Sequence, residues 1–137
     1  MMINYYMIIV YCFIGGLPSY AIETVYQTRL FFKGDIYFIV SDLASPIIDI
    51  LKNKYNVIII PYKQVIDAEF NQCTEQYIHK FSIVEAAKGR ERLFIYAFER
   101  FAVLYQLMCQ RNITDVFFIE LDNLIYDDPL KIGRAHV

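Results

Sequence analysis

Short apolar runs that alternate with stretches of helical spacing constrain the fold of this chain more than any other feature. The four runs lie at residues 7–14, 36–40, 57–60 and 116–119. The first run, which is rich in Ile and Val and ends at Gly15 and Gly16, is typical of a strand buried on both faces, and the other three are shorter apolar strands. Strands alternating with helices favour parallel pairing through right-handed crossovers. The sequence therefore predicts an α/β fold with a Rossmann-like, mostly parallel sheet flanked by helices.

The first two helices are predicted between these strands. Ser19 is expected to cap the first helix, and Gly34 lies just beyond its expected end. The apolar stripe of this helix is predicted to be Ile22, Val25, Tyr26 and Leu30. Ser45 and Pro46 are a favourable cap and first position for the second helix. That helix is predicted to present Ile47, Ile48, Ile50 and Leu51.

A longer helix is predicted at 91–111, with Asn112 ending it. Its expected inner stripe consists of Phe94, Ala97, Phe98, Phe101, Leu104 and Met108. Between residues 62 and 89 the pattern is weak and predicts only two short helices, at 65–70 and 81–88.

Charge and cysteine content exclude several classes of function. The chain has 15 acidic and 13 basic residues, a net charge of -2, so no broad basic surface is expected to bind nucleic acid phosphates. The three cysteines, Cys12, Cys73 and Cys109, are widely spaced and form no C-x-x-C pair. This pattern fits neither a disulfide scaffold nor a thiolate zinc site.

No membrane segment is predicted. The apolar run 7–14 is too short to span a bilayer, and no Lys or Arg precedes it as in a signal peptide. The stretch from Leu93 to Cys109 carries Glu99 and Arg100 at its centre, where lipid would impose a large cost. A cytoplasmic location is therefore expected.

The last seven residues, 131–137, have the sequence KIGRAHV. This peptide can be encoded by codons that contain the opening of a widely used sequencing adapter. We therefore expect the natural sequence to depart from this one after Leu130, with 1–130 forming the first part of a longer domain and 131–137 an adapter-derived tail.

In a parallel sheet, ligands bind outside the carboxyl ends of the strands. The loop after the first strand contains Gly15, Gly16 and Pro18, and small residues there let a ligand approach the backbone. Asp42 follows the second strand and is a short hydrogen-bond acceptor for a nucleotide. Simple turn-forming roles remain open for both places.

Glu120 and Asp122 follow the fourth strand. If the segment stays extended, residues two apart point to the same side, so both carboxylates would converge. Adjacent like charges are costly without a partner, and a hard divalent cation such as Mg²⁺ or Mn²⁺ would remove their repulsion. The alternative is a solvated turn at the end of a strand.

The context of this acidic pair resembles a known family. Residues 99–108 lead into the sequence DVFFIELDNLIYDDP at 115–129, which is similar to the region around the acid-x-acid motif of nucleotide-sugar glycosyltransferases with the GT-A fold. The segments 17–20, 27–29 and 35–39 resemble the first strand-helix-strand unit of such enzymes.

The resemblance implies a donor site at the carboxyl edge of the sheet, with a divalent metal, Mn²⁺ or Mg²⁺, bridging the nucleotide-sugar diphosphate. Asp122 would hold the metal. Glu120, which departs from the commoner Asp-x-Asp form, would reach the ribose or a metal-bound water. Asp42 and the loop from Gly15 through Gly16 to Pro18 would contact base and ribose.

Arg100 would approach the diphosphate, although a helix-surface pairing with a neighbouring Glu is the alternative. The acceptor is unknown, and this chain alone is expected to lack transferase activity because no acceptor site is identified in it.

Two other classes remain to be weighed. One is a non-catalytic nucleotide-binding or scaffolding α/β domain. The other is a receiver or phosphatase domain, which needs an acid at the end of the first strand, where this chain has Ile14, Gly15 and Gly16.

Overall fold

The computed structural model describes residues 7–66 and 91–129. The chain forms two compact units. The first comprises the described parts of 1–61 and 114–137, and the second those of 62–113. Each unit is described separately below.

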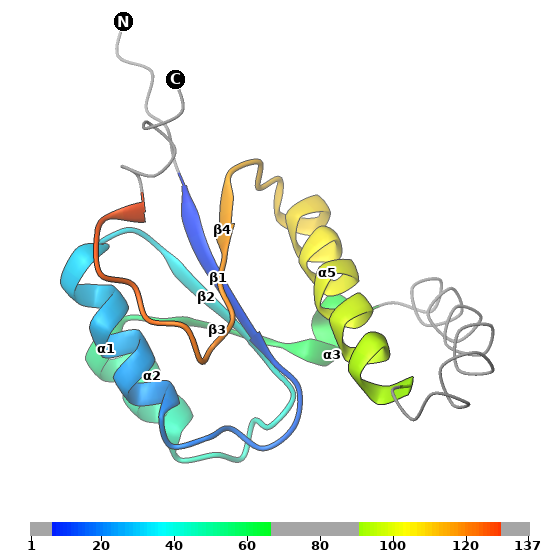
Figure 1. Ribbon diagram of the computed structural model, residues 1–137, viewed down its shortest axis with the longest axis horizontal. Helices are drawn as coiled ribbons and strands as arrows, with labels where there is room; N and C mark the ends of the chain where they lie inside the picture. The colour runs from blue at the N-terminus through cyan, green and yellow to red at the C-terminus, as the bar shows by residue number, and fades with distance from the viewer. Residues whose placement is uncertain (1–6, 67–90, 130–137) are drawn as a thin grey trace, which may run out of the picture. The chain divides into compact units, whose positions relative to one another are not determined.

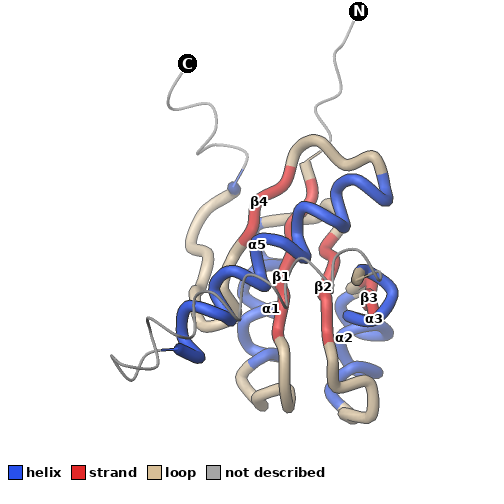
Figure 2. Tube along the Cα trace, turned by 90° about the vertical axis from the view of Figure 1, so that its right-hand side faces the viewer, coloured by secondary structure: helices blue, strands red, loops and turns tan. Residues whose placement is uncertain are grey.

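The first unit contains a four-stranded, all-parallel sheet of order β3-β2-β1-β4 (Figure 1). The strands are β1 (Ile8–Phe13), β2 (Ile36–Val40), β3 (Ile58–Pro61) and β4 (Val116–Phe118). Figure 2 shows β1 and β2 running side by side at the centre of this sheet. All four predicted strands are present, and the prediction of a Rossmann-like α/β fold is confirmed.

The central position of β1 explains its continuous apolar sequence. Residues Ile8 to Tyr11 have no solvent exposure, although successive side chains point to opposite faces of the sheet. On one face, Ile9 and Tyr11 join the hydrophobic core that contains Val25 of α1 (Ala21–Phe31) and Leu51 of α2 (Ile47–Tyr55). Helices α1 and α2 therefore cover that face.

The inner face of α1 differs from the predicted stripe. Its buried residues are Ala21, Thr24, Val25 and Thr28. Tyr26 and Leu30 of the expected stripe are 52% and 54% exposed, so that part of the prediction is wrong. The two threonines replace them on the buried face because their hydroxyls are hydrogen-bonded there, as described below.

The predicted caps have different outcomes. Ser19 does not cap α1: the N-cap position is Tyr20, without a side-chain cap, and the Ala21 N–H donates to the Pro18 carbonyl at 3.1 Å. The Ser45 hydroxyl accepts the Ile47 N–H at 3.3 Å, but the N-cap position of α2 is Pro46, without a side-chain cap, so the predicted start of this helix is shifted by one residue. The end of α2 is set by Asn56, which has a left-handed φ of 54°.

Arg29 joins the carboxyl ends of α1 and α2. Its Nε donates to the Tyr55 carbonyl at 2.8 Å, and its Nη1 donates to the Gly34 carbonyl at 2.6 Å. The carbonyls of Phe32 and Asn56 accept further bonds at 3.3 Å. Partial burial lowers the pKa of the Arg29 guanidinium, yet an arginine remains charged in proteins. The Arg29 guanidinium therefore donates hydrogen bonds to carbonyls at the carboxyl ends of two helices, where the helix dipole is negative.

The second unit contains α3 (Tyr62–Val65) and α5 (Glu91–Arg111), which are joined by a bond from Gln110 Nε2 to the Val65 carbonyl at 2.8 Å. Asn112 ends α5 with a φ of 54°, as predicted. The short helix predicted at 65–70 is wrong at its start, because α3 begins at 62 and Ile66 is not helical. The rest of that segment and the 81–88 helix lie outside the described residues.

The predicted inner face of α5 is wrong at Phe101. Among residues 99–111, Val103 and Leu107, one turn apart, are buried, whereas Phe101 of the expected stripe is 63% exposed. Apolar residues lie on several sides of this helix, so spacing alone did not identify the buried face. Among the described helices, none combines the length and the apolar character needed to cross a membrane.

The hydrogen bonds from Arg29 to the carbonyls at the ends of α1 and α2, called the Arg29 clamp, give the first testable prediction. We expect Arg29→Met, which keeps an apolar stem but removes the donors, to lower the free energy of unfolding by about 1–3 kcal/mol, because it leaves partly buried carbonyls without a partner. Chemical denaturation measures this change. The matched control is Lys33→Met, at an exposed position, for which we expect a change within about 0.5 kcal/mol. Equal effects of the two substitutions would contradict the clamp.

Glu99 gives a prediction on pH dependence. Burial raises the pKa of its carboxyl above the ordinary value of 4.5, so the folded protein holds this proton more tightly than the unfolded chain. Stability is then lost as the pH rises from 4.5 through the folded-state pKa. We expect Glu99→Gln to raise Tm at about pH 7 and this gain to shrink towards about pH 4. A gain in Tm that is independent of pH would show that ionisation of Glu99 is not its cause.

Candidate functional site

The carboxyl edge of the sheet contains a topological switch point. The chain passes outward from β1 to β2 and β3, then returns to the other side of β1 with β4. Because all strands are parallel, the loops after β1, β2 and β4 leave from this same edge (Figure 1). In open α/β sheets, ligands bind in the crevice between loops that diverge at such a point. Here the diverging loops are those after β1 and β4.

Residues 120–123, called the acidic turn below, follow β4. The last paired residue of β4 is Phe118, opposite Val10, and the Ile119 N–H then donates to the Val10 carbonyl at 3.2 Å. The next backbone–backbone hydrogen bond along this described segment runs from the Asn123 N–H to the Glu120 carbonyl at 3.0 Å. This four-residue closure is a β-turn. The expectation of an extended segment through Glu120 and Asp122 is therefore wrong.

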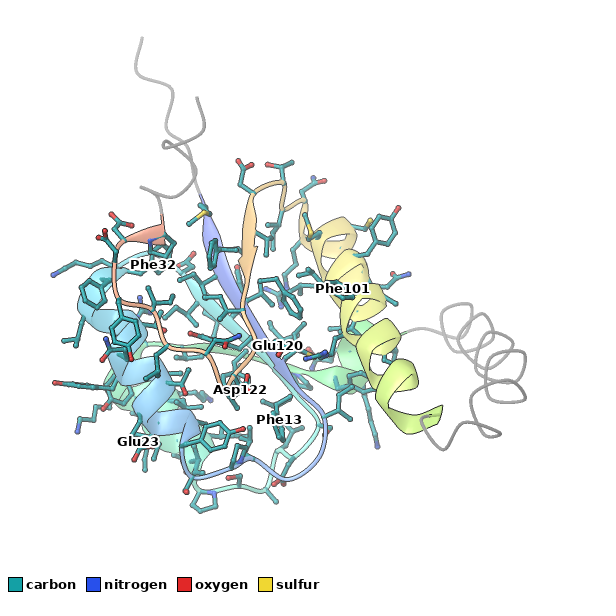
Figure 3. The ribbon with its side chains drawn as sticks, in the orientation of Figure 1. Phe13, Glu23, Phe32, Phe101, Glu120 and Asp122 are labelled. Atoms are coloured by element: carbon teal, nitrogen blue, oxygen red, sulfur yellow. The ribbon has the colours of Figure 1, made fainter. Side chains whose placement is uncertain are left out.

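The turn nevertheless exposes both carboxylates. Glu120 and Asp122 are exposed, whereas Leu121 between them is only 4% exposed and belongs to the core. Figure 3 shows both acidic side chains at the carboxyl edge, near Phe13 at the end of β1. Burial of Leu121 thus fixes which side of the turn faces inward, and the acidic side chains occupy the solvent-facing side.

Two side chains of α1 hold the segment that contains the acidic turn. Thr24 Oγ1 donates to the Leu121 carbonyl at 2.8 Å, in a buried position. Gln27 Nε2 donates to the Ile125 carbonyl at 3.0 Å. Sequence reasoning missed both residues. The available signal was the presence of polar side chains near the apolar face of a helix next to the first strand.

A chain of hydroxyls continues from Thr24 to β1. Thr28 Oγ1 donates to the Thr24 carbonyl at 3.0 Å, and the Tyr11 hydroxyl lies 2.5 Å from Thr28 Oγ1. A threonine hydroxyl has one proton, so Thr28 accepts from Tyr11, and Tyr11 is the donor. Burial raises the pKa of the Tyr11 phenol, which therefore keeps the proton that it donates at neutral pH.

The loop after β1 is tied to the end of β2. The Gly15 N–H donates to Ser41 Oγ at 2.7 Å, and Gly15 has a φ of 106°, a conformation that favours glycine. Gly16 is exposed, and a Cβ there would meet no atom within 4 Å. Pro18 is half-buried. Asp42 follows Ser41 directly and is also half-buried, so the structure brings two predicted site segments together through a serine that the sequence analysis did not single out.

The three loops of the first unit at this edge carry charges of one sign only. The loops at 14–20, 41–46 and 119–123 contain Asp42, Glu120 and Asp122 and no Lys or Arg. The first turn of α1 adds Glu23, and the N–H groups of Ala21 and Ile22 are already bonded to the Pro18 and Ser19 carbonyls. This helix start is therefore poorly suited to an anion. A phosphate group at this edge would need a cation between it and the carboxylates.

The donor set fits a hard cation. Glu120 and Asp122 offer carboxylate oxygens, which suit Mg²⁺ and Mn²⁺. Among residues 7–66 and 91–129, no three His, Cys, Asp or Glu side chains gather into a metal-binding group. The role of Glu120 and Asp122 as metal ligands therefore stays a prediction.

Arg100, the remaining predicted site residue, lies on α5 in the second unit, where it is half-buried. Its expected contact with a diphosphate stays a prediction.

Comparison with known proteins adds no assignment. No family model matches the chain, and neither the curated proteins nor the solved structures give a significant match. What the structure establishes is a small α/β domain with a four-stranded parallel sheet.

Proposed function

We propose that this chain is the nucleotide-sugar-binding part of a metal-dependent glycosyltransferase of the GT-A type. The observation that carries the proposal is the acidic turn, which places two exposed carboxylates beside the switch point of a parallel sheet. The absence of Lys and Arg from the three neighbouring loops supports a metal, because carboxylates alone would repel a diphosphate. The resemblance around 115–129 supports the choice of substrate class.

The proposed roles follow from exposure and chemistry. Asp122 is a metal ligand, and Glu120 reaches either a metal-bound water or the ribose of the donor. The metal, when bound, neutralises the diphosphate and stabilises the leaving phosphate as the glycosidic bond breaks. Asp42 accepts hydrogen bonds from the base or ribose, since its carboxylate follows β2 at the same edge.

The loop after β1 provides the remaining wall of the proposed donor site. Gly15 sets the path of the backbone, and Gly16 leaves space that a side chain would occupy. The Ser41 hydroxyl accepts the Gly15 N–H, which fixes this loop against the end of β2 before any ligand arrives. A loop that is already ordered loses less conformational entropy on binding.

The test is binding of a nucleoside diphosphate to the full chain with and without Mn²⁺. We expect UDP or GDP to bind in the presence of Mn²⁺, EDTA to abolish binding, and Asp122→Asn to weaken it at least about tenfold, since an acidic metal ligand is lost. Isothermal titration calorimetry measures the affinities.

The matched control is Asp115→Asn. Asp115 is exposed and precedes β4, at the opposite end of the same strand, so this substitution makes the same charge change away from the proposed site. We expect it to leave binding within about twofold. Nucleotide binding that resists both EDTA and Asp122→Asn would favour a metal-independent nucleotide-binding domain, and no binding at all would favour a scaffolding role.

A further inference from the structure

We infer that Thr24 and Gln27 of α1 are positioning residues that hold the acidic turn in its metal-binding conformation. This inference deepens the proposed function and rests on it for the identity of the ligand. The polar inner face of α1 is thereby given a role in the site.

The sheet itself does little to hold the acidic turn. Strand β4 has only three residues, and β1 continues for three more, Tyr11 to Phe13, beyond the last pair with Phe118. After the Ile119 N–H bond to Val10, the next backbone bond along this described segment is the closure between Asn123 and Glu120. Such a short turn needs support from elsewhere to keep one orientation.

Helix α1 supplies that support through side-chain donors. The Leu121 carbonyl accepts from Thr24 in a buried position, and the Ile125 carbonyl accepts from Gln27 two residues after the turn ends. One bond therefore holds the chain within the turn, at Leu121, and the other holds it after the turn, at Ile125. Leu121 and Ile125 are also buried in the core, so the bonds and the apolar contacts hold the same two residues.

Thr24 is itself fixed in place. Its neighbours Ala21 and Val25 are fully buried, and its own carbonyl accepts the Thr28 hydroxyl, which in turn accepts from Tyr11 of β1. The Thr28 bond goes to a carbonyl within α1, so the helix and its buried neighbours hold Thr24 in place, and the Thr28 hydroxyl itself makes no bond to the turn.

The bond from Thr24 to the Leu121 carbonyl also affects the position of Asp122. The carbonyl that Thr24 binds belongs to the peptide unit between Leu121 and Asp122. Removing the hydroxyl leaves that buried carbonyl without its donor, and the peptide unit is expected to rotate towards water. Such a rotation displaces the Asp122 backbone and its carboxylate. Loss of groups that orient a metal ligand typically weakens metal affinity about 10–100-fold.

The test compares three variants of the full chain. Thr24→Val removes the hydroxyl at constant shape, and Thr24→Ser keeps it. Thr28→Val makes the same change one turn later on the same buried face, without touching the Leu121 carbonyl. Mn²⁺ binding in the presence of UDP or GDP is measured for each, together with Tm.

We expect Thr24→Val to weaken Mn²⁺ binding at least about tenfold. Thr24→Ser and Thr28→Val should stay within about threefold of the unchanged protein, even if Thr28→Val lowers Tm. Equal binding by Thr24→Val and the unchanged protein would overturn the inference. A similar loss in Thr24→Val and Thr28→Val would also overturn it, because the effect would then follow stability alone.

A second measurement separates this inference from the proposed function. Hydrogen exchange of the Asn123 amide reports opening of the acidic turn whether or not a metal binds. We expect faster exchange in Thr24→Val than in Thr24→Ser, with unchanged exchange in β1. If the unchanged protein binds neither Mn²⁺ nor nucleotide, the proposed function fails. If the Asn123 exchange is the same in both variants, the positioning role fails.

As a further variant, Gln27→Met removes the amide donor to Ile125 and keeps a side chain of similar length. We expect the same direction of change as for Thr24→Val in Asn123 exchange, but a smaller effect, because this bond is only partly buried. Exchange slower than in the unchanged protein would contradict a supporting role for Gln27.

Discussion

The buried hydrogen bond from Thr24 to the Leu121 carbonyl connects parts of the chain that are 97 residues apart. Contacts of such long range carry a large entropic cost of closing the chain between them. Helix α1 makes a second one through Gln27, which also binds the segment after β4. Over shorter separations, Thr28 binds Tyr11 of β1 and Arg29 binds the end of α2. The first unit therefore depends on one helix whose polar side chains are bonded to three other elements.

This arrangement explains why buried polar groups occur in an otherwise apolar core. An unsatisfied carbonyl in the interior costs about 1–3 kcal/mol, and a carbonyl on a turn has no strand neighbour to bond. Threonine offers a methyl group for packing and a hydroxyl for the carbonyl. At positions 24 and 28 both parts of the side chain are used, so their burial carries no unpaired polar atom.

Apolar patterning predicted the fold well because the two central strands, β1 and β2, are largely buried. Ile8 to Tyr11 and Phe38 to Val40 are inaccessible to solvent, and a run of such residues bounded by Gly or Pro has few other interpretations. Patterning failed on α1 and α5 for different reasons. On α1 it counted Thr24 and Thr28 as polar, since the sequence does not reveal their bonding partners. On α5 apolar residues occur on several sides, so Phe101 was assigned to the interior although it is exposed.

The sequence also predicted where the candidate site lies, but not its local conformation. The carboxyl edge follows from the parallel pairing that alternating strands and helices predict, and the acidic pair follows from its position after β4. The turn was not predictable from alternation, because it arises where β4 stops pairing while β1 continues. The Gly15 contact with Ser41 and the Thr24 contact with Leu121 depend on how two segments meet in space. No local pattern contains that information.

If Glu120 and Asp122 hold the proposed metal, their exposure separates its binding from folding. Water screens the repulsion between exposed carboxylates, so the metal-free chain has no buried charge to compensate at this turn. The core around Leu121 and Ile125 consists of apolar side chains, and the carbonyls of both residues accept hydrogen bonds from α1. A structural zinc site behaves in the opposite way, since its binding energy is folding energy. In this chain the fold would orient the carboxylates first, and the free energy of metal binding would remain available for holding the diphosphate of a donor.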